Sequence, residues 1–216
     1  MAGRTVRAEQ VSATRELILT AAERLFAERG VNAVSNRQVS EAAGQGNNTA
    51  VGYHFGTKED LVRAIVRKHA ARIEEIRSRL LAGIGDDPGV RDWADCLVRP
   101  IPEHLADLGG TTWYARFCAQ VMTDPALHQI LVEESLSSPT LRQIIDGLSA
   151  CLPELPPEVR AERAEMARHL IMHIPAERER AVAEHAPTPR ANWHDAATGL
   201  VDALVGMWTA PVGPAR

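Results

Sequence analysis

The chain of 216 residues has only three cysteines and no long hydrophobic run. Cys96, Cys118 and Cys151 are widely spaced and form no C-x-x-C pair, which argues against a disulfide framework or a zinc site and favours buried apolar roles. No apolar stretch approaches the roughly 18 residues of a membrane span, and the N-terminus has no basic-then-apolar signal peptide. We therefore expect a cytoplasmic protein that makes no membrane contact.

The sequence also lacks the patterns that common enzymes share. It has no phosphate-binding glycine loop, no nucleophile and base at a recognisable spacing, and no metal-ligand set. His169 and His173 are four residues apart, but a metal site needs three or four ligands and no carboxylate or cysteine completes this one. We expect no catalytic residues, no metal and no cofactor.

The charge that is present is divided unevenly along the chain. The net charge is -4, yet residues 1–85 hold 13 Lys and Arg against 9 Asp and Glu, whereas the remainder holds 11 against 19. Contacts to DNA phosphates need local positive charge rather than a positive whole chain. This division favours a DNA-binding head on an acidic body.

The residues from Ser35 to Lys58 read as two short helices joined by a glycine turn. Ser35 and Gln38 have the spacing of a capping box, so a helix should begin at Asn36, and Gly44 should end it in a left-handed conformation. A polar run follows, and then a second short helix over residues 49–55. This pattern is typical of a helix-turn-helix, whose second helix lies in the major groove of DNA.

The helices on either side complete a small head. Residues 13–29 carry apolar side chains at helical spacing, and Thr57 with Asp60 should cap a helix of about 25 residues that leads into the body. Residues 1–12 lack an apolar pattern. We expect them to form a mobile arm, which either reaches DNA or is a frayed terminus.

The rest of the chain also reads as helical, without a regular strand alternation. Pro175 should kink or divide the penultimate helix, because proline removes an internal hydrogen bond. The fold class is all-α: a three-helix head over residues 1–56, joined by the long helix to a larger helical domain over residues 57–216. Helices are expected at about 90–108, 111–123, 125–134 with continuation or a restart to 151, 157–185, and 191–209.

From about Thr14 to Val66 the chain resembles the tetracycline repressor (TetR) family of transcriptional regulators. The resemblance rests on LFAERG at the end of the first helix, Ala-Gly after the second, Tyr-His-Phe in the third, and Gly-Thr-Lys-Glu-Asp-Leu beyond it. Family members commonly have one residue fewer before the aromatic segment. The extra residue should lengthen the turn at residues 45–47, which leaves the register of base contacts open.

Two groups of side chains are candidates for DNA contact. Polar residues of the turn and recognition helix are suited to base edges, although Asn47 or Asn48 could instead cap the helix. The resemblance implies that Tyr53, His54 and Lys58 contact phosphates, and a buried, hydrogen-bonded His54 is the alternative. The full set is Arg37, Gln38, Gln45, Asn47, Asn48, Thr49, Gly52, Tyr53, His54 and Lys58.

The body offers candidates for two further sites. Its aromatic residues and soft sulfur atoms gather in two neighbouring segments, where the resemblance implies a small-molecule pocket and ordinary core is the alternative. These pocket candidates are Trp93, His104, Trp113, Tyr114, Arg116, Phe117 and Met122. The last two helices are rich in apolar residues, and the resemblance implies that they pair with a second subunit. These interface candidates are Met166, Leu170, His173, Trp193, Leu200, Leu204, Val205 and Trp208.

The sequence thus predicts a homodimeric transcriptional regulator. It should bind a palindromic DNA operator, most simply as a repressor, and should be released by a small apolar or amphipathic effector. Activation in place of repression is an open alternative. Two other classes compete with this prediction: a small-molecule enzyme or carrier with an incidental helix-turn-helix, and a helical module that binds another protein.

Overall fold

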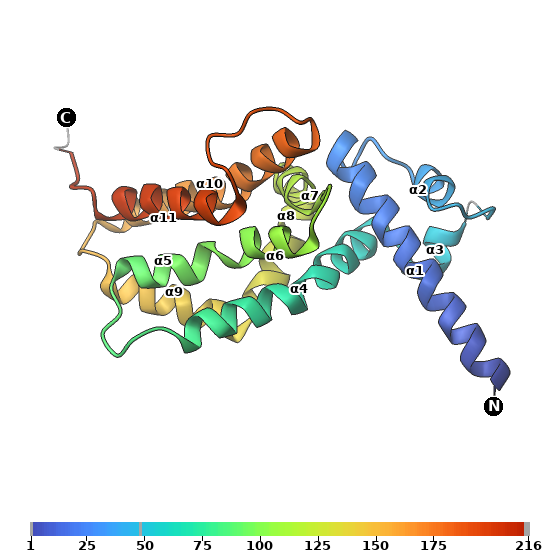
Figure 1. Cartoon of the computed structure of the whole chain (residues 1–216), viewed down its shortest axis with the longest axis horizontal. Helices are drawn as coiled ribbons and strands as arrows, with labels where there is room; N and C mark the ends of the chain where they lie inside the picture. The colour runs from blue at the N-terminus through green and yellow to red at the C-terminus, as the bar shows by residue number, and fades with distance from the viewer. Residues whose placement is uncertain (1, 48, 214–216) are drawn as a thin grey trace. The chain divides into compact units, whose positions relative to one another are not determined.

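A computed structural model describes residues 2–47 and 49–213, and side chains from residue 9 onward. The regular structure of these residues is all helical, as predicted. The N-terminal helices are α1 (Ala2–Arg29), α2 (Asn36–Ala42), α3 (Ala50–Phe55) and α4 (Lys58–Ala82) (Figure 1). The later helices are α5 (Val90–Val98), α6 (Pro100–Leu108), α7 (Tyr114–Met122), α8 (Pro125–Leu136), α9 (Pro139–Cys151), α10 (Pro157–Ala183) and α11 (Trp193–Thr209).

The N-terminal arm that we expected is helical instead. Helix α1 begins at Ala2 and continues without interruption to Arg29. Residues 4–12 have no apolar face, but most of them are residues that lose little side-chain freedom in a helix. Because these residues extend a helix that is already anchored farther along, no new nucleation is needed.

The chain forms two compact units. The first contains the residues up to His69 together with Arg116–Glu134, so most of α7 and most of α8 belong to the same unit as the helix-turn-helix. Phe26 of α1 stacks on Phe117 of α7, with 6.3 Å between the ring centroids, and both rings are fully buried. Asn32 donates to Asp124 across 2.6 Å in the same unit. The division at residues 56 and 57 that we expected stays a prediction.

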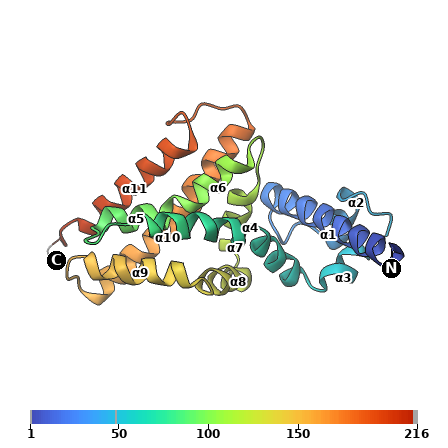
Figure 2. The ribbon, with the colours of Figure 1, turned by 60° about the horizontal axis from the view of Figure 1, so that its bottom comes forward.

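The second unit contains Ala70–Ala115 and Ser135–Arg216. Helix α5 lies between α9 and α11 in both views (Figures 1 and 2). The core between these helices includes Trp93, Ile144, Leu200 and Leu204, all buried. Trp93 packs so closely on Gly147 of α9 that a Cβ atom there would lie 2.4 Å from its ring.

Prolines explain where the helices of this unit differ from the prediction. The single helix expected over residues 90–108 is two helices, α5 and α6, which meet at Arg99 because Pro100 has no N–H to continue the hydrogen-bond ladder. Pro175, by contrast, does not divide α10, and the kink that we gave as the other outcome stays a prediction. Pro175 and Ala176 are buried, and packing of this segment offsets the missing bond.

Candidate nucleic-acid interface

Helix α2 begins and ends where its sequence predicts. The Ser35 amide donates to Oε1 of Gln38 across 2.8 Å, and the Gln38 amide donates to Oγ of Ser35 across 3.3 Å. This reciprocal pair confirms the capping box. Gly44 has a φ of +67°, a left-handed conformation that glycine adopts without strain, and the chain turns there.

The turn ends at Asn47, which organises the start of α3. Its Oδ1 accepts hydrogen bonds from the Thr49 amide at 2.9 Å and from the Thr49 hydroxyl at 2.7 Å. The Ala50 amide donates to the Asn47 carbonyl at 3.0 Å, and α3 begins at Ala50. The Asn47 side chain thus holds Thr49, the N-cap residue of α3, and does not itself cap the helix. The lengthening of the turn at residues 45–47 stays a prediction. Asn48 lies outside the described residues.

One face of α3 is open to solvent. Ala50 and Val51 are buried against the rest of the head, whereas Thr49 and Gly52 are exposed and the Tyr53 side chain is 79% exposed. The His54 ring is half-buried and meets the Tyr53 ring edge-on, with 4.9 Å between the centroids. The exposed face therefore presents the hydroxyl of Thr49, the phenol of Tyr53 and the backbone at Gly52. These groups suit contact with a polar surface.

Several other candidates already have partners within the head. Arg37 is 71% exposed and pairs with Glu41 at 2.8 Å. Gln45 donates to the Ala43 carbonyl at 3.1 Å. Exposed ion pairs of this kind contribute little and exchange readily, so Arg37 remains available to a phosphate, whereas Gln38 is held by its capping box.

Lys58 holds the chain that precedes α2. Its ammonium donates to the carbonyls of Val31 at 3.1 Å and Val34 at 2.8 Å. A lysine ammonium has three hydrogens, so one remains for another acceptor. Lys58 therefore stabilises the loop between α1 and α2 through these two hydrogen bonds. Its position in the sequence did not indicate this role.

Arg15 is a residue of this site that the sequence analysis missed. Its guanidinium carbon lies 4.3 Å from the centroid of the Phe55 ring, and Nη1 donates to the His54 carbonyl. Arg15 is three residues before Ile18 and seven before Ala22, which are fully buried, so it follows the apolar face of α1. A basic residue at helical spacing from buried apolar residues of the same helix is the sequence pattern that could have identified Arg15.

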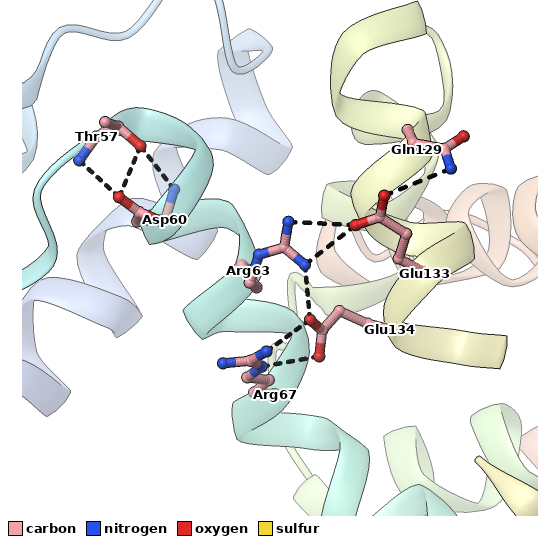
Figure 3. Close-up of polar contacts among 7 residues, drawn as sticks. All are labelled: Thr57, Asp60, Arg63, Arg67, Gln129, Glu133 and Glu134. Carbon is pink, nitrogen blue, oxygen red and sulfur yellow. Dashed lines mark hydrogen bonds and ion pairs between the residues drawn. The ribbon is translucent and has the colours of Figure 1, made fainter. Parts of the chain in front are cut away.

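A cluster of ion pairs joins α4 to α8 in the same unit (Figure 3). Arg63 reaches Glu134 at 2.8 Å and Glu133 at 3.3 Å, and Arg67 reaches Glu134 at 2.8 Å. The hydrogen bonds from Arg67 are the largest cause that lowers the pKa of the Glu134 carboxyl below its ordinary value of 4.5, and burial opposes them. Thr57 and Asp60 form the expected cap at the start of α4.

Replacement of Glu134 by glutamine should change how stability depends on pH. A carboxyl whose pKa is lowered by folding stabilises the native state above its unfolded pKa, and this stabilisation is lost as the pH falls through the folded value. We expect Glu134→Gln to lower the free energy of unfolding by about 1 kcal/mol at neutral pH, and the difference from the parent to shrink below about pH 4.5. Urea titrations across this range measure it.

Glu133→Gln is the matched control for this prediction, because Glu133 is 50% exposed and meets Arg63 at the longer distance of 3.3 Å. We expect its effect at neutral pH to be within about 0.5 kcal/mol. Equal effects of the two substitutions, or a Glu134→Gln effect that does not change with pH, would contradict the assignment of this titration to Glu134.

The pocket candidates are distributed over several environments. His104 and Tyr114 are both buried, and their rings meet edge-on at 6.0 Å. Phe117 belongs to the head unit, where it stacks on Phe26. Trp93 is in the core between α5, α9 and α11. The half-buried candidates are Trp113, Arg116 and Met122.

A buried carboxylate lies beside the His104 and Tyr114 segments. Glu179 of α10 is 2% exposed, and its Oε1 accepts from the Thr112 hydroxyl at 2.8 Å and from the Ala115 amide at 3.2 Å. It therefore caps the first turn of α7 from a different helix. No short sequence pattern indicated this role, because the residues are more than sixty positions apart.

The interface candidates divide into exposed and buried side chains. Leu200, Leu204 and Trp208 were expected at a subunit interface, but they are buried in the core of a single chain, with Leu204 at 0% exposure. Met166 is 45% exposed. The half-buried candidates are Leu170, His173, Trp193 and Val205. The interface prediction therefore rests on the outer side of α10 and the edges of α11.

Fold and site together define a helical protein with an N-terminal helix-turn-helix. The model of the tetR family of bacterial regulatory proteins matches residues 18–65, and the model of a tetracycline repressor-like C-terminal domain matches residues 95–207. The chain belongs to the tetR family. It is therefore a member of a family of regulatory proteins and not of enzymes, as the sequence predicted.

Curated relatives match part of the chain. The HTH-type transcriptional repressor AcnR of Corynebacterium glutamicum is 38% identical over 85 residues, which are 37% of this chain and 45% of the relative. AcnR of Corynebacterium efficiens gives the same identity over the same length. The match thus spans less than half the length of these relatives.

Solved structures support the fold over nearly the whole chain. A tetR-family regulatory protein from Rhodococcus RHA1 is 18% identical with a TM-score of 0.58, covering 92% of this chain and 98% of that one. The regulator PfmR from Thermus thermophilus is 16% identical with a TM-score of 0.52, covering 92% and 97%. Across the described residues, no helix has both the length and the apolar character that a membrane span needs.

Proposed function

We propose that this protein is a cytoplasmic transcriptional repressor that binds a palindromic DNA operator as a homodimer. The exposed face of α3, from Thr49 to the 79% exposed Tyr53, is the observation that carries the proposal. Its position after a capped helix and a glycine turn suits entry into a major groove. The AcnR relatives, named repressors, favour repression over activation.

The contacts to DNA follow from the chemistry of the exposed groups. We assign Thr49 to base edges, and Arg37, Tyr53, His54 and Lys58 to phosphates or to support of the groups that touch them. We assign Asn47 to the turn before α3, where its side chain accepts two hydrogen bonds from Thr49. A protein that neutralises several phosphates releases counterions, so its DNA affinity should fall steeply with salt concentration.

A competition experiment tests this function. A labelled DNA fragment from upstream of the protein's own gene is titrated with the purified full chain, with the same bases in scrambled order as the competitor. We expect preferential binding to the intact fragment at moderate salt, and weaker binding of Tyr53→Ala to intact and scrambled fragments alike, because a phosphate contact is independent of sequence. Equal affinity for intact and scrambled fragments from every candidate promoter would contradict operator binding and would favour the protein-interaction module.

Gly52 provides a further test of contact between α3 and DNA. A Cβ atom at this position would meet no other part of the chain within 4 Å, so packing against α1 does not explain the absence of a side chain. We expect Gly52→Ala to stabilise the fold by about 0.5–1 kcal/mol, because alanine favours a helix over glycine. The same substitution should weaken operator binding, because the methyl group occupies the space closest to the DNA backbone.

Gly199→Ala in α11 is the matched control for Gly52→Ala. A Cβ atom there would make ordinary contacts, the closest at 3.7 Å to Arg190. We expect a similar gain in melting temperature without a change in operator affinity. If Gly52→Ala binds DNA as well as the parent does, the DNA backbone does not approach this position.

We infer that a small apolar or amphipathic molecule regulates this repressor by binding within the second unit. The buried rings of His104 and Tyr114, beside the carboxylate of Glu179, support a site with apolar walls and a few polar groups. The dimer would have two states, and only one of them has its heads spaced to fit the operator. The effector releases the DNA because it binds the other state more tightly. Helix α4, with 25 residues, is the element that leads from head to body.

A further inference from the structure

The recognition helix is too short to hold its own orientation. Helix α3 has six residues, and isolated helices need about 12–15 residues to be even marginally stable in water. Its first residues, Ala50 and Val51, are buried against the head. Its last residues, from Tyr53 to Phe55, are exposed or half-buried, so their orientation depends on specific contacts at that end.

Arg15 makes two such contacts from α1. Its guanidinium lies over the Phe55 ring, 4.3 Å from the centroid, and its Nη1 donates to the His54 carbonyl. The last carbonyls of a helix have no partner within it and carry a partial negative charge, so a cation is favoured there. Figures 1 and 2 both show α3 beside α1, and residues 15 and 54 are 39 positions apart in the chain.

A guanidinium can make both contacts at once because it is planar. One face stacks on the aromatic ring while an edge N–H points to a carbonyl. A lysine ammonium has no plane and would have to favour one contact over the other. Two contacts with different directions fix both the position and the rotation of the C-terminal end of α3, which a single apolar contact does not.

We propose that Arg15 is a positioning residue that sets the orientation of α3 for sequence-specific binding, without itself contacting DNA. This inference rests on the proposed function. If α3 loses its orientation, the base contacts are lost while phosphate contacts made elsewhere in the head persist. The affinity for the operator should therefore fall, whereas the affinity for unrelated DNA should not.

The test compares four single variants and one double variant of the full chain, and measures their affinities for operator and non-operator DNA over a range of salt concentrations. Arg15→Ala removes both contacts, Arg15→Lys keeps the charge without the plane, and Phe55→Leu keeps an apolar side chain without the ring. Arg29→Ala is the control, since it removes one charge from the exposed end of the same helix.

We expect Arg15→Ala and Arg15→Lys to weaken operator binding roughly tenfold or more, with non-operator affinity and the salt slope unchanged. Phe55→Leu should weaken it similarly, and Arg15→Ala combined with Phe55→Leu should be no worse than the stronger single change, because both disrupt one interaction. Arg29→Ala should retain the operator preference of the parent.

Three results would overturn the proposal. If operator and non-operator affinities fall together and the salt slope decreases by about 0.9 for each arginine lost, Arg15 is a phosphate contact. If neither affinity changes, Arg15 has no part in binding. If the effects of Arg15→Ala and Phe55→Leu add fully, the two residues act independently.

A measurement without DNA separates this proposal from the proposed function. The Gly56 amide donates to the Gly52 carbonyl across 3.0 Å, and its hydrogen exchange reports the order of the C-terminal end of α3. Arg15→Lys should accelerate this exchange while exchange in α4 is unchanged. Unaltered exchange would contradict the positioning role even if the parent binds its operator, and a parent that binds no DNA selectively would contradict the function instead.

Discussion

Aspartate in place of Leu204 is expected to unfold the chain, whereas aspartate in place of Ile174 is expected to separate two folded copies. Leu204 is 0% exposed in the core with Trp93 and Ile144. Loss of a buried leucine costs about 2–5 kcal/mol, and a buried carboxylate without a partner adds a further penalty. The sum is comparable with the whole stability of an ordinary domain, which is about 5–15 kcal/mol.

Ile174 is the contrasting position because it is 45% exposed on the outer side of α10. A substitution at such a surface usually changes the stability of a single chain by less than about 0.5 kcal/mol. In a two-fold dimer that joins these surfaces, however, each copy would introduce a charge into the same apolar contact. We expect the Ile174→Asp protein to sediment as a monomer and to have a melting temperature that no longer depends on protein concentration.

Sedimentation together with circular dichroism melting distinguishes the outcomes. Met166→Asp, one more exposed position on α10, is a second variant that should behave as Ile174→Asp does. A dimer that persists in both variants would place the interface elsewhere. A Leu204→Asp protein that melts close to the parent would contradict the burial of this side chain in the single chain.

Alanine in place of Glu179 is expected to destabilise the second unit by about 2–4 kcal/mol. The substitution removes the acceptor of the Thr112 hydroxyl and of the Ala115 amide, both of which are buried. A buried donor that loses its partner costs about 1–3 kcal/mol. Glutamine at this position retains an acceptor oxygen, so Glu179→Gln should cost no more than about half as much.

Glu177→Ala is the matched control on the same helix, since Glu177 is exposed and pairs with Arg180 three residues later, at 2.9 Å. Its effect should be within about 0.5 kcal/mol. Urea unfolding measures all three variants, and hydrogen exchange at the Ala115 amide locates the change. Equal stabilities of Glu179→Ala and Glu179→Gln would show that this oxygen does not cap α7.

The local features of the head could be predicted because they depend on neighbouring residues. The two capping boxes, the glycine at the end of α2 and the length of α4 all follow from residues within one or two helical turns of each other. The same is true of the restart at Pro139, where the Leu141 amide donates to Ser138 across 3.0 Å. Periodicity also identified the buried faces of α1 and α4, except that Leu17, at helical spacing with the apolar residues of α1, is 55% exposed.

The features that were missed depend on contacts between distant segments. Arg15 and Phe55, Phe26 and Phe117, and Glu179 and Ala115 are each brought together by packing that no short pattern encodes. The apolar face of α11 illustrates the limit, because periodicity reveals that a face is covered but not what covers it. Leu200, Leu204 and Trp208 are covered by the chain itself, where a second subunit was expected.

Selection of bound sequences from a pool of random double-stranded DNA tests the central claim most directly. If α3 of each subunit enters a major groove, the selected sequences should contain two inverted half-sites with centres separated by about 10 bp or a multiple of it. A single half-site without its inverted copy, or no enrichment by the parent at moderate salt, would contradict a homodimer that reads DNA through α3.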